Sequence, residues 1–427
     1  MEQEALQRLV TEAAREVRRG TSEDGVRGSH VLTLVNVILD TALEEEATDI
    51  HLEPMGGRLR IRMRVDGLLQ EHPVQFPAEL APVIIARLKV MAGIDTAKRN
   101  RPQDGQIRYV HGGRTIDMRA AVLPVVDGER MVVRIMDAAE RFLGCAELGF
   151  TPRNQEIFEQ LIRRPTGLLL LCGPMNSGKT TTLYAALSVL NDPSCHIMTL
   201  EDPVERRIEG ISQFQVHPEA GLTFVAGLRA ALRQDAHVDG SVDPVRDKEI
   251  IDTELQIRDL ETAEMAVRIA LTGHALFSTL HTEDTVSAVF RMIEMGVPPY
   301  LLAATLSGVI AQRLVRRVCT HCREDYIVLP GSREAIRLGA DYHEGMTLVR
   351  GHGCALCHGS GYHGRMAIHE VLLVSERMRE AILCGNNRDA LRRAAEADSV
   401  ETLWQDGIAK ACAGETTLEE VERALHG

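Results

Sequence analysis

Residues 173–180 carry the clearest chemical signal in this sequence. They read Gly-Pro-Met-Asn-Ser-Gly-Lys-Thr and match the phosphate-loop pattern G-x-x-x-x-G-K-S/T. An apolar run over 168–172 precedes them, and a helical pattern over 181–190 follows them. In this setting, backbone N–H groups and the positive end of the helix surround a phosphate. The pattern therefore predicts a site for a nucleoside triphosphate.

Two side chains of this loop have roles set by their chemistry. Lys179 is expected to reach the β- and γ-phosphates, and Thr180 to hold Mg²⁺. An ordinary glycine-rich turn is the plain alternative, but strand, loop, Lys-Thr and helix all stand in register. The residues predicted to line the nucleotide are Gly173, Pro174, Met175, Asn176, Ser177, Gly178, Lys179, Thr180 and Thr181.

Cysteines form a second group with a chemical pattern. Cys319 and Cys322 make one C-x₂-C pair, and Cys354 and Cys357 make another, with residues 323–353 between them. Four thiolates so spaced are typical of a closed, structural Zn²⁺ site. Alternatives are a ligand set that includes a nearby histidine, an iron–sulfur cluster, or four unligated thiols. Nothing in the sequence indicates electron transfer, so zinc is predicted. The five other cysteines are expected to be small buried residues: Cys145, Cys172, Cys195, Cys384 and Cys412.

Composition and charge limit the class of protein. The 427 residues are 44% hydrophobic and carry a net charge of −13. An acidic chain does not suit a nucleic-acid motor that works by neutralising phosphates, and 4% aromatic residues leave little for base stacking. The start of the chain lacks the apolar core of a signal peptide, and its apolar stretches are shorter than a bilayer span. We expect a cytosolic protein of two or three domains.

Hydrophobic periodicity divides the sequence into a short leader and two larger parts. Residues 1–30 predict an amphipathic helix and a linker, with the helix packed on its own chain rather than on a partner. Residues 31–140 predict a small α/β domain with an antiparallel sheet. Residues 141–427 show the strand–helix alternation of a parallel-sheet nucleotide domain.

One short segment shows the antiparallel pattern most clearly. From Arg58 to Val65, four arginines alternate with four apolar side chains, so one face of the predicted strand is basic and the other apolar. Asp66-Gly67 then predicts a hairpin turn.

Several further segments resemble those of a known family. Residues 201–205 look like its acidic box, and residues 272–282 look like its histidine box. From Val31 to Leu425 the sequence is similar to the secretion NTPase superfamily, the ATPases of type II secretion and type IV pilus machinery. The paired cysteines mark its assembly class, because the related retraction ATPases generally lack them. Other matching segments are 47–54, 101–105, 227–235, 257–263 and 361–365.

This resemblance implies an α/β fold in which a small PAS-like α/β domain precedes a RecA-like P-loop nucleotide domain. Within the latter it places a zinc-binding module at about 319–365 and C-terminal helices over 366–427. It also implies a hexameric motor that hydrolyses ATP, uses Mg²⁺ and Zn²⁺, and drives an inner-membrane platform protein. Such a motor is cytoplasmic, peripheral to the inner membrane through its partners, and does not bind nucleic acid.

The resemblance also assigns roles to individual residues. Glu201 and Glu205 are expected to place carboxylates near Mg²⁺ and the γ-phosphate, and His281 to sense the γ-phosphate end. An arginine supplied by a neighbour makes hydrolysis depend on ring assembly. The arginines expected to reach the nucleotide of an adjacent subunit, or to lie near that interface, are Arg119, Arg134, Arg229 and Arg233. For the last two, the exposed face of one helix is the alternative.

The strand that should carry the catalytic base departs from the family pattern. The family runs from Gln-Asp almost directly into an apolar strand that ends Gly-Glu-Ile-Arg-Asp. Here the loop is longer by about a dozen residues, which costs little closure entropy. Gln256 stands where the glutamate is expected, and a neutral amide cannot accept a proton from water. Glu254 can substitute if the strand bulges or shifts by two residues, because a shift of two keeps the same face.

Two milder departures remain. Met175-Asn176 replaces the usual Thr-Gly of the phosphate loop, and Asn tolerates left-handed backbone geometry. Only the short leader precedes Val31, so the large extra N-terminal domain of many assembly ATPases is expected to be absent. We therefore expect an ATP-hydrolysing assembly motor. The alternatives are a nucleotide-binding structural subunit with impaired hydrolysis, a pilus-retraction motor, and a nucleic-acid translocase, which the acidic charge disfavours.

Overall fold

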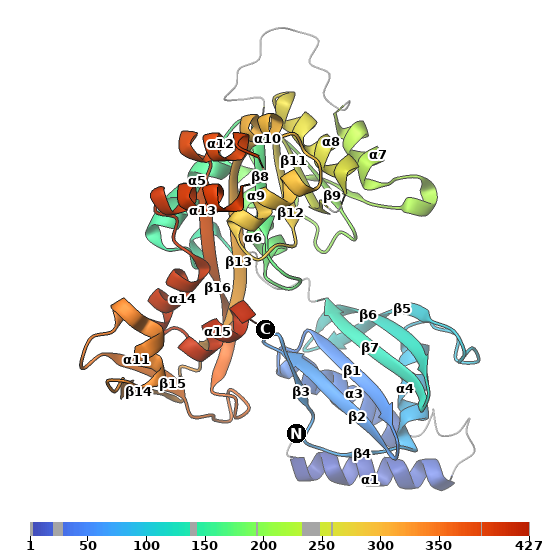
Figure 1. Ribbon diagram of the computed structural model, residues 1–427. Coiled ribbons are helices and arrows are strands. Elements are labelled where there is room, and N and C mark those ends of the chain that lie inside the picture. Colours follow the sequence, from blue (N-terminus) through green and yellow to red (C-terminus); the bar gives the residue numbers. More distant parts are fainter. Residues whose placement is uncertain are drawn as a thin grey trace. The chain divides into compact units, whose positions relative to one another are not determined.

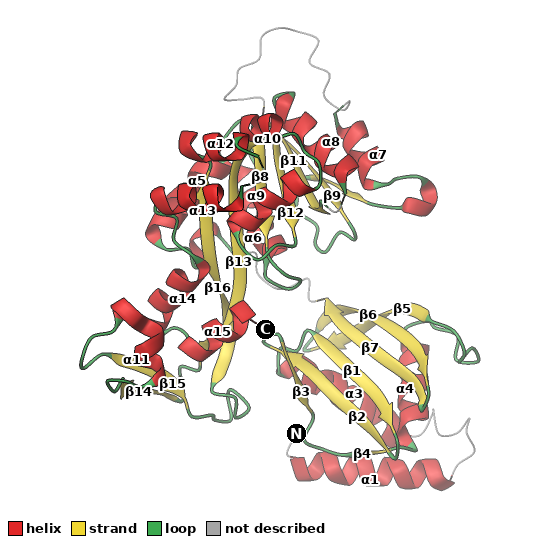
Figure 2. Ribbon diagram, in the orientation of Figure 1, coloured by secondary structure: helices red, strands yellow, loops and turns green. Residues whose placement is uncertain are grey.

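The chain forms two compact units, Met1–Glu140 and Arg141–Gly427 (Figure 1). The computed structural model describes residues 3–19, 29–136, 143–193, 195–232, 248–257, 259–385 and 387–426, and over 248–256 it describes the backbone alone. Each unit is built on its own seven-stranded sheet with helices packed on it (Figure 2). The predicted α/β class is therefore confirmed.

The first unit is an antiparallel sheet covered by helices. Its strand order is β3-β2-β1-β7-β6-β5, with β4 paired to β2, and its neighbouring strands run antiparallel, as predicted. The strands are β1 (Asp49–Met55), β2 (Arg58–Val65), β3 (Leu68–Glu71), β4 (Phe76–Pro77), β5 (Gln103–His111), β6 (Arg114–Val125) and β7 (Gly128–Met136). The helices are α1 (Gln3–Arg19), α3 (Ser29–Glu44) and α4 (Leu80–Met91).

Alternation along β2 gives this sheet one apolar and one charged face. Leu59, Ile61 and Met63 are buried in a single core with side chains of the three helices. The arginines between them meet carboxylates of β1; Arg62 Nη2 lies 2.7 Å from Glu53 Oε1. The predicted two-faced strand is confirmed, and its basic face is partly neutralised by acids of the next strand.

The turn after β2 also follows the prediction. Val65 pairs with Leu68, so Asp66 and Gly67 form a two-residue hairpin loop. Both have positive φ, 49° and 82° respectively, as a type I′ turn requires.

Helix α1 belongs to the core of the first unit. Its apolar residues recur at helical spacing, and Leu6, Val10 and Ala13 are buried among residues of α3, α4 and the sheet. The helix therefore packs on its own chain, which was the preferred interpretation of the leader.

The second unit contains a mainly parallel sheet. Its order is β10-β9-β11-β12-β8-β13-β16, and only the last pair, β13 with β16, is antiparallel. Strand β8 lies between β12 and β13 and is buried along five of its six residues, so it reads as an unbroken apolar run. The strands are β8 (Gly167–Cys172), β9 (Cys195–Glu201), β10 (Ser212–Gln215), β11 (Lys248–Gln256), β12 (Ala275–Leu280), β13 (Leu306–Val318) and β16 (Tyr362–Leu373).

Helices pack on both faces of this sheet, because alternate residues of β8 enter different cores. Leu169 and Leu171 pack with α5 and α6, whereas Leu168 and Leu170 pack with α7, α8, α9 and the later helices. The helices before the cysteines are α5 (Pro152–Ile162), α6 (Lys179–Leu190), α7 (Phe224–Ala231), α8 (Leu260–Leu271), α9 (Thr285–Glu294) and α10 (Pro299–Thr305). Short 3₁₀ turns cover Cys145–Glu147, Pro218–Ala220 and Gly339–Asp341.

A long hairpin carries the cysteines beyond the sheet. Strand β13 pairs with β8 only as far as Ala311 and continues with β16 as its partner, ending just before Cys319. Between the cysteine pairs lie β14 (Arg323–Ile327), α11 (Arg333–Leu338) and β15 (Thr347–Gly351).

The C-terminal helices start later than predicted. Residues 366–373 belong to β16, because they pair with β13 and complete the sheet. The first helix after the hairpin begins at Glu376, ten residues after the expected 366. The helices are α12 (Glu376–Leu383), α13 (Arg388–Ala397), α14 (Leu403–Cys412) and α15 (Leu418–His426).

Two further sequence expectations can be compared with the structure. Among the described residues, no helix combines the length and apolar character needed to cross a bilayer. Cys145 and Cys172 are buried as expected, but Cys195 is only partly buried, and Cys384 and Cys412 are exposed. Cys195 begins β9, Cys384 is the C-cap of α12, and Cys412 is the last residue of α14, so all three lie at the ends of their elements.

Candidate functional site

The phosphate loop leaves β8 and enters α6 through left-handed backbone geometry. Gly173 has a φ of 152°, and a Cβ there would lie 2.5 Å from the Gln312 carbonyl oxygen and 2.6 Å from Ser177 Oγ. Gly178, the N-cap of α6, has a φ of 86°. Asn176 has a φ of 61°, which is the left-handed geometry that Asn was expected to tolerate. The loop is thus shaped by three residues that accept positive φ.

Gln312 holds this loop in shape, a role that was not predicted from the sequence. Its side chain is buried on β13, one residue beyond the pairing of Ala311 with Cys172. Gln312 Nε2 donates to the Ser177 carbonyl at 2.9 Å, and Thr182 Oγ1 donates to Gln312 Oε1 at 2.7 Å. The sequence offered little signal, because Gln312 lies where the apolar start of β13 meets the basic segment 313–317.

Lys179 and His281 meet at the first residue of the loop. Lys179 Nζ donates to the carbonyl oxygens of Gly173 and Pro174, both at 2.8 Å. His281 follows β12, whose Leu280 pairs with Cys172, and its Nδ1 lies 3.0 Å from the Gly173 carbonyl oxygen. The structure therefore brings the predicted histidine and the predicted lysine to the same backbone atom.

Glu201 is a buried carboxylate held by three neighbours. It ends β9 and accepts hydrogen bonds from Tyr184 (2.5 Å), Thr199 (2.6 Å) and Gln213 (2.9 Å). Tyr184 follows Thr180 by one turn of α6, so the two side chains share a helix face. Glu201 therefore lies on the side of α6 that carries Thr180. Glu205, in the loop after β9, is exposed.

Strand β11 is irregular where the catalytic glutamate was expected. It lies between β9 and β12, and its pairing steps from Thr253 opposite Ser278 to Gln256 opposite Thr279. Two residues, Glu254 and Leu255, are thus extra on the β11 side. This is a bulge of the kind on which a substitution by Glu254 was predicted to depend. The side chains of Glu254 and Gln256 lie outside the described residues, as does all of Arg233.

Arg119 and Arg134 are cross-strand neighbours in the first unit's sheet. They are a directly opposed pair on β6 and β7, and both are exposed. Arg134 Nε also donates to Asp49 Oδ1 at 3.1 Å. Arg229, in the second unit, is exposed on α7 and pairs with Glu261 of α8 at 3.0 Å. Within one chain it therefore lies on an exposed helix face, which was the alternative given for it.

Four cysteine sulfurs converge at the end of the long hairpin. All four Sγ atoms lie within 4.8 Å of one another. The Cys319–Cys354 and Cys322–Cys357 sulfurs are 3.8 Å apart, and those of Cys354 and Cys357 are 3.7 Å apart. A tetrahedral Zn²⁺ with Zn–S bonds of about 2.3 Å places its sulfurs roughly 3.8 Å apart, so these residues fit zinc.

Two backbone N–H groups favour the thiolate of Cys357. Cys357 Sγ accepts N–H groups of Cys354 at 3.2 Å and Gly361 at 3.3 Å. Burial would raise the pKa of the Cys357 thiol, but these N–H groups, together with hydrogen bonds from the thiols of Cys354 and Cys322, lower it to about 6. Close backbone approach requires glycine here, since a Cβ on Gly351 would lie 2.0 Å from the Gly361 carbonyl oxygen. Among the described residues, the ligand group contains four cysteines and no histidine; His352 pairs with Glu324 instead.

The fold and the phosphate loop together define a class of protein. A parallel sheet whose strand β8 runs into a glycine-rich loop and a helix N-terminus is a P-loop nucleotide-binding unit. The family model for type II/IV secretion system proteins matches residues 26–423. The chain therefore belongs to the type II/IV secretion system protein family, and the predicted class of secretion and pilus-assembly ATPases is confirmed.

Three relatives illustrate the match. Type II secretion system protein E of Pseudomonas aeruginosa is 43% identical over 393 residues, which are 92% of this chain and 75% of that protein. Type II secretion system ATPase E of Vibrio cholerae is 42% identical over 394 residues, again 92% and 75%. The type IV pilus assembly ATPase PilB of Thermus thermophilus is 40% identical over 420 residues, 96% of this chain and 45% of PilB.

Solved structures support the same fold. The Legionella pneumophila ATPase DotB has a TM-score of 0.65 at 19% identity, covering 92% of this chain and 95% of its own. The pilus retraction motor PilT with bound ADP has a TM-score of 0.59 at 23% identity, covering 92% and 97%. At these identities the likeness concerns the fold alone.

Proposed function

We propose that this chain is an ATP-hydrolysing motor that works as a homohexamer in type II secretion or type IV pilus assembly. The observation that carries the proposal is the meeting of Lys179 and His281 at the carbonyl oxygen of Gly173. A phosphate cradle with a cation and an imidazole at its first residue suits a nucleotide whose terminal phosphate is cleaved.

The phosphate loop divides the work of binding among its residues. When bound, Mg²⁺-ATP supplies the phosphate chain and the γ-phosphoryl group that is transferred to water. Loop N–H groups and the N-terminus of α6 hold the phosphates, and Lys179 neutralises their charge. The hydroxyl of Thr180 is the protein ligand offered to Mg²⁺. Gln312 keeps the loop in shape through its hydrogen bond to Ser177.

Two carboxylates are proposed to support the metal shell. Glu201 contributes a buried negative charge on the Thr180 side of α6. Because its oxygens already accept three hydrogen bonds, it orients the shell rather than taking a proton from water. Glu205, exposed in the next loop, is the second carboxylate offered to that shell.

Arginines are proposed to complete the site from an adjacent subunit. Arg119 and Arg134 present two exposed guanidinium groups at directly opposed positions, which suits recognition of a phosphate chain outside their own unit. The two arginines would stabilise the negative charge that spreads over the transferring phosphoryl group. Hydrolysis would therefore require the assembled hexameric ring. Arg229 and Arg233 are proposed to lie near the same interface.

A structural Zn²⁺ is proposed at Cys319, Cys322, Cys354 and Cys357. The sulfur spacings and the N–H donors to Cys357 support it. Such an ion would tie the end of β13 to the start of β16. The partner proposed for the whole motor is an inner-membrane platform protein, which would hold this chain at the cytoplasmic face of the membrane.

ATP turnover by the assembled oligomer tests the proposed motor. Oligomeric state is measured by size-exclusion chromatography with light scattering, and phosphate release is measured on the same fractions. Lys179→Ala is the control that removes the phosphate-loop cation. A verified hexamer that binds ATP but releases phosphate no faster than Lys179→Ala would reject the motor.

A nucleotide-binding structural subunit with impaired hydrolysis is the second candidate. It is favoured by Gln256 at the position of the family's catalytic glutamate and by the register irregularity of β11 beside it. The two candidates share the nucleotide site and differ in whether a carboxylate reaches the attacking water.

A further inference from the structure

A cavity lies at the opposite end of β8 from the phosphate loop. It has a volume of about 380 Å³ and is lined by the segments 164–167, 270–271 and 304–307 together with Arg379 of α12. Gly167 is the first residue of β8, and the phosphate loop begins after its last, Cys172. A strand of this length spans roughly 20 Å, so the cavity is separate from the nucleotide site.

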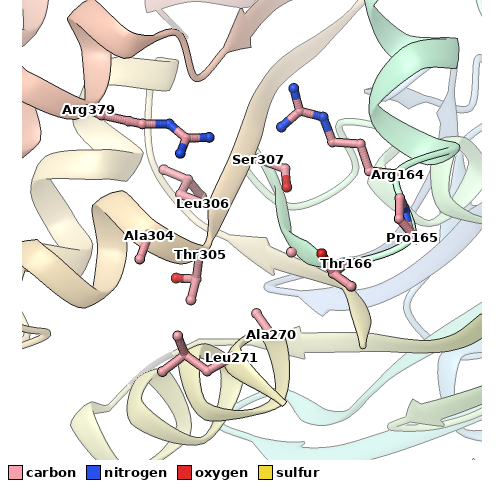
Figure 3. Close-up of a pocket in the computed structure, with 11 residues that line it drawn as sticks. Arg164, Pro165, Thr166, Ala270, Leu271, Ala304, Thr305, Leu306, Ser307 and Arg379 are labelled. Atoms are coloured by element: carbon pink, nitrogen blue, oxygen red, sulfur yellow. The ribbon is translucent and has the colours of Figure 1, made fainter. Parts of the chain in front are cut away.

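Two arginines enter this cavity from opposite sides. Figure 3 shows the guanidinium groups of Arg164 and Arg379 pointing toward each other across it, with Ser307 nearby. Arg164 follows α5, and its backbone N–H donates to the Leu161 carbonyl at 3.2 Å. Arg379 lies on α12, and its backbone N–H donates to the Ser375 carbonyl at 2.9 Å. Both backbones are therefore fixed by a helix or by its last turn.

The two positive charges are not balanced by the lining of the cavity. The lining contains no acidic residue, and no ion pair or side-chain hydrogen bond joins either guanidinium to another of the described residues. Burial lowers the pKa of Arg164, and the positive charge of Arg379 lowers it further. Carbonyl ends of α8 and α10 supply partial negative charge nearby, but helix ends carry only about half an elementary charge each. Both arginines are only partly buried, so water screens part of their repulsion, and an anion between the two guanidinium groups would relieve the rest.

The other residues that line the cavity determine which kind of anion it can bind. Hydroxyls are present at Thr166, Thr305 and Ser307, and apolar side chains at Leu271 and Leu306. A carboxylate would neutralise one arginine, whereas a phosphate monoester carries about two negative charges at neutral pH and three acceptor oxygens. The cavity is larger than one phosphate ion needs, and its volume falls in the usual range for small organic ligands.

The backbone at Gly167 preserves this space. A Cβ at that position would lie 2.1 Å from Ser307 Oγ and 3.1 Å from the Thr305 carbonyl oxygen. Gly167 also has a φ of 121°, which side-chain-bearing residues rarely adopt. Glycine thus lets the start of β8 pass beside the two hydroxyl residues of β13 and α10 without filling the cavity.

We propose that Arg164 and Arg379 form the anion-binding end of a second ligand pocket, which takes a small soluble molecule bearing a phosphate group. The phosphate would lie between the two guanidinium groups, and the organic part would rest on the apolar lining. The site is separate from the proposed nucleotide site, since the two share no residue.

Inorganic phosphate is the first probe, used with the full chain at saturating Mg²⁺ and a non-hydrolysable ATP analogue, so that the nucleotide site is filled up to the γ-phosphate position. Isothermal titration should detect one remaining phosphate site per chain in the wild type. Arg164→Gln and Arg379→Gln should each weaken that site about tenfold, because each removes a charge-assisted contact. Arg392→Gln, an exposed arginine of α13, is the matched control and should bind phosphate like the wild type.

Thermal unfolding separates loss of the site from loss of the fold. In phosphate-free, low-salt buffer, Arg164→Gln and Arg379→Gln should unfold at or above the wild-type temperature, because repulsion is relieved. Added phosphate should then raise the unfolding temperature of wild type and Arg392→Gln but not that of the two cavity variants. Destabilisation of both variants without phosphate would mean that the arginines support the fold, and would overturn the proposal.

Two further outcomes also overturn it. Absence of phosphate binding once the ATP analogue fills the nucleotide site, or equal binding by all four proteins, would remove the second pocket. Vesicles of phosphatidylglycerol and phosphatidylcholine form the second arm of the test. Vesicle binding that requires both arginines, without binding of free phosphate, would assign the same phosphate chemistry to a lipid headgroup and reject the soluble ligand.

Discussion

His281 Nδ1 lies 3.0 Å from the carbonyl oxygen of Gly173, so the end of β12 contacts the first residue of the phosphate loop. The same oxygen accepts a hydrogen bond from Lys179 Nζ at 2.8 Å. A change at the phosphates can therefore pass to β12 through one backbone atom. This contact predicts that His281 couples nucleotide state to the rest of the unit more than it contributes to affinity.

His281→Ala should lower kcat about threefold to tenfold, which corresponds to the net worth of one hydrogen bond. ADP affinity should change less than kcat, because the phosphate cradle and Lys179 remain. Steady-state phosphate release and equilibrium ADP titration give the two numbers. His274→Ala, at the other end of β12, is the control; equal losses in both variants would show that His281 supports only the strand.

Arg119→Ala and Arg134→Ala should each reduce turnover by far more than they reduce nucleotide affinity. Both side chains are exposed, and the Arg134–Asp49 ion pair is solvent-accessible on the arginine side, so stability should change by no more than about 0.5 kcal/mol. Mixing either variant with wild-type chains should depress activity, because mixed interfaces form. Arg114→Ala, at the start of β6, serves as the control.

Normal turnover in both single variants would place Arg119 and Arg134 outside catalysis. A loss of turnover that does not depend on mixing would instead locate their effect within one chain. The mixing experiment therefore reports on the subunit that supplies the arginines, which kinetics of the pure variants do not.

Purified protein should contain about one zinc per chain, because four sulfurs at tetrahedral spacing form a closed site. Cys354→Ser should release the metal and loosen the segment between β13 and β16, while ADP binding at the phosphate loop persists. Metal analysis and limited proteolysis measure the two effects. Cys384→Ser, an isolated exposed cysteine, should change neither; metal-free protein with four freely titrating thiols in this cluster would contradict the prediction.

Local patterns in the sequence predicted much of this molecule, and long-range pairing supplied the rest. The phosphate loop and the alternation of β2 depend on residues adjacent in the chain, so spacing alone indicated them. The strand character of residues 366–373 depends on pairing with β13, about 55 residues earlier, and the predicted start of the C-terminal helices was wrong for that reason. Gln312 was missed because its role exists only where β13 passes the end of β8.

The cavity at Arg164 and Arg379 was beyond sequence reasoning for a related cause. The two arginines are separated by more than two hundred residues, and neither belongs to a motif. Only the packing of α12 and β13 beside the start of β8 brings them together. The tetracysteine cluster is the opposite case. The C-x₂-C spacing within each pair predicted it, although a whole module lies between the two pairs.

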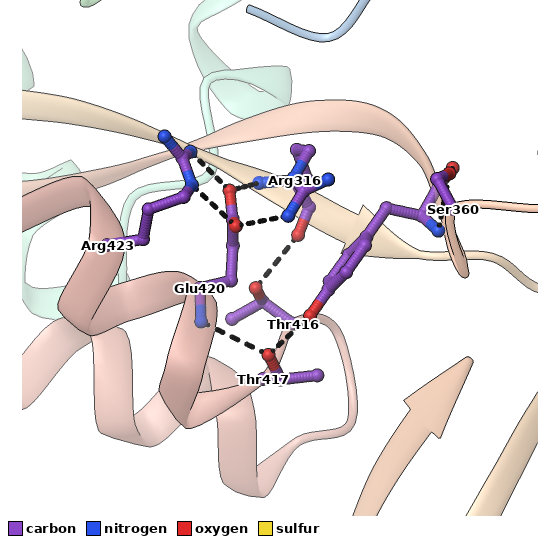
Figure 4. Close-up of polar contacts among 7 residues, drawn as sticks. Arg316, Ser360, Thr416, Thr417, Glu420 and Arg423 are labelled. Carbon is purple, nitrogen blue, oxygen red and sulfur yellow. Dashed lines mark hydrogen bonds and ion pairs between the residues drawn. The ribbon is translucent and has the colours of Figure 1, made fainter. Parts of the chain in front are cut away.

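The contacts of Glu420 predict how acid should affect the stability of the C-terminal part of the chain. Its buried carboxylate accepts the backbone N–H of Arg316 at 2.9 Å, Arg316 Nη2 at 2.8 Å and Arg423 Nε at 2.8 Å (Figure 4). Arg316 also stacks on Tyr362, whose hydroxyl is 2.8 Å from Thr417 Oγ1. The network thus joins α15 to β13 and to the strand that follows the second cysteine pair.

Burial would raise the pKa of Glu420, but hydrogen bonds from Arg423 and Arg316 hold it below the usual 4.5. The unfolded chain therefore takes up the proton first as pH falls. The stabilisation is complete above about pH 4.5 and is lost as pH falls through the lower folded pKa. Urea unfolding from neutral pH down to about pH 3 should show this loss.

Glu420→Gln should flatten that acid dependence and cost about 3 kcal/mol at neutral pH, because Arg316 and Arg423 lose a buried counter-charge. Glu415→Gln breaks an exposed pair with Arg317 and should cost at most about 1 kcal/mol. An acid profile unchanged by Glu420→Gln would assign the loss to other carboxylates.

The irregular pairing of β11 leads to the prediction that separates a motor from a nucleotide-binding scaffold. If Gln256 occupies the catalytic position, the site has a phosphate cradle and a Mg²⁺ ligand but no carboxylate for the attacking water. General-base assistance is typically worth about 10²–10⁴-fold, so ATP should bind well and turn over slowly. Gln256→Glu should then raise turnover, while Glu254→Gln should have little effect.

The bulge gives Glu254 a physical route to the same role. With two extra residues between Thr253 and Gln256, the backbone of β11 is re-aimed just before it reaches Thr279. If Glu254 serves as the base, the wild type turns over at an ordinary rate, Glu254→Gln loses about 10²-fold or more, and Gln256→Glu gains nothing. ADP affinity, measured for both variants, should stay near that of the wild type in either case, because neither residue belongs to the phosphate loop. Turnover of the two variants, each assayed beside wild type and Lys179→Ala in verified oligomers, therefore decides which residue faces the attacking water.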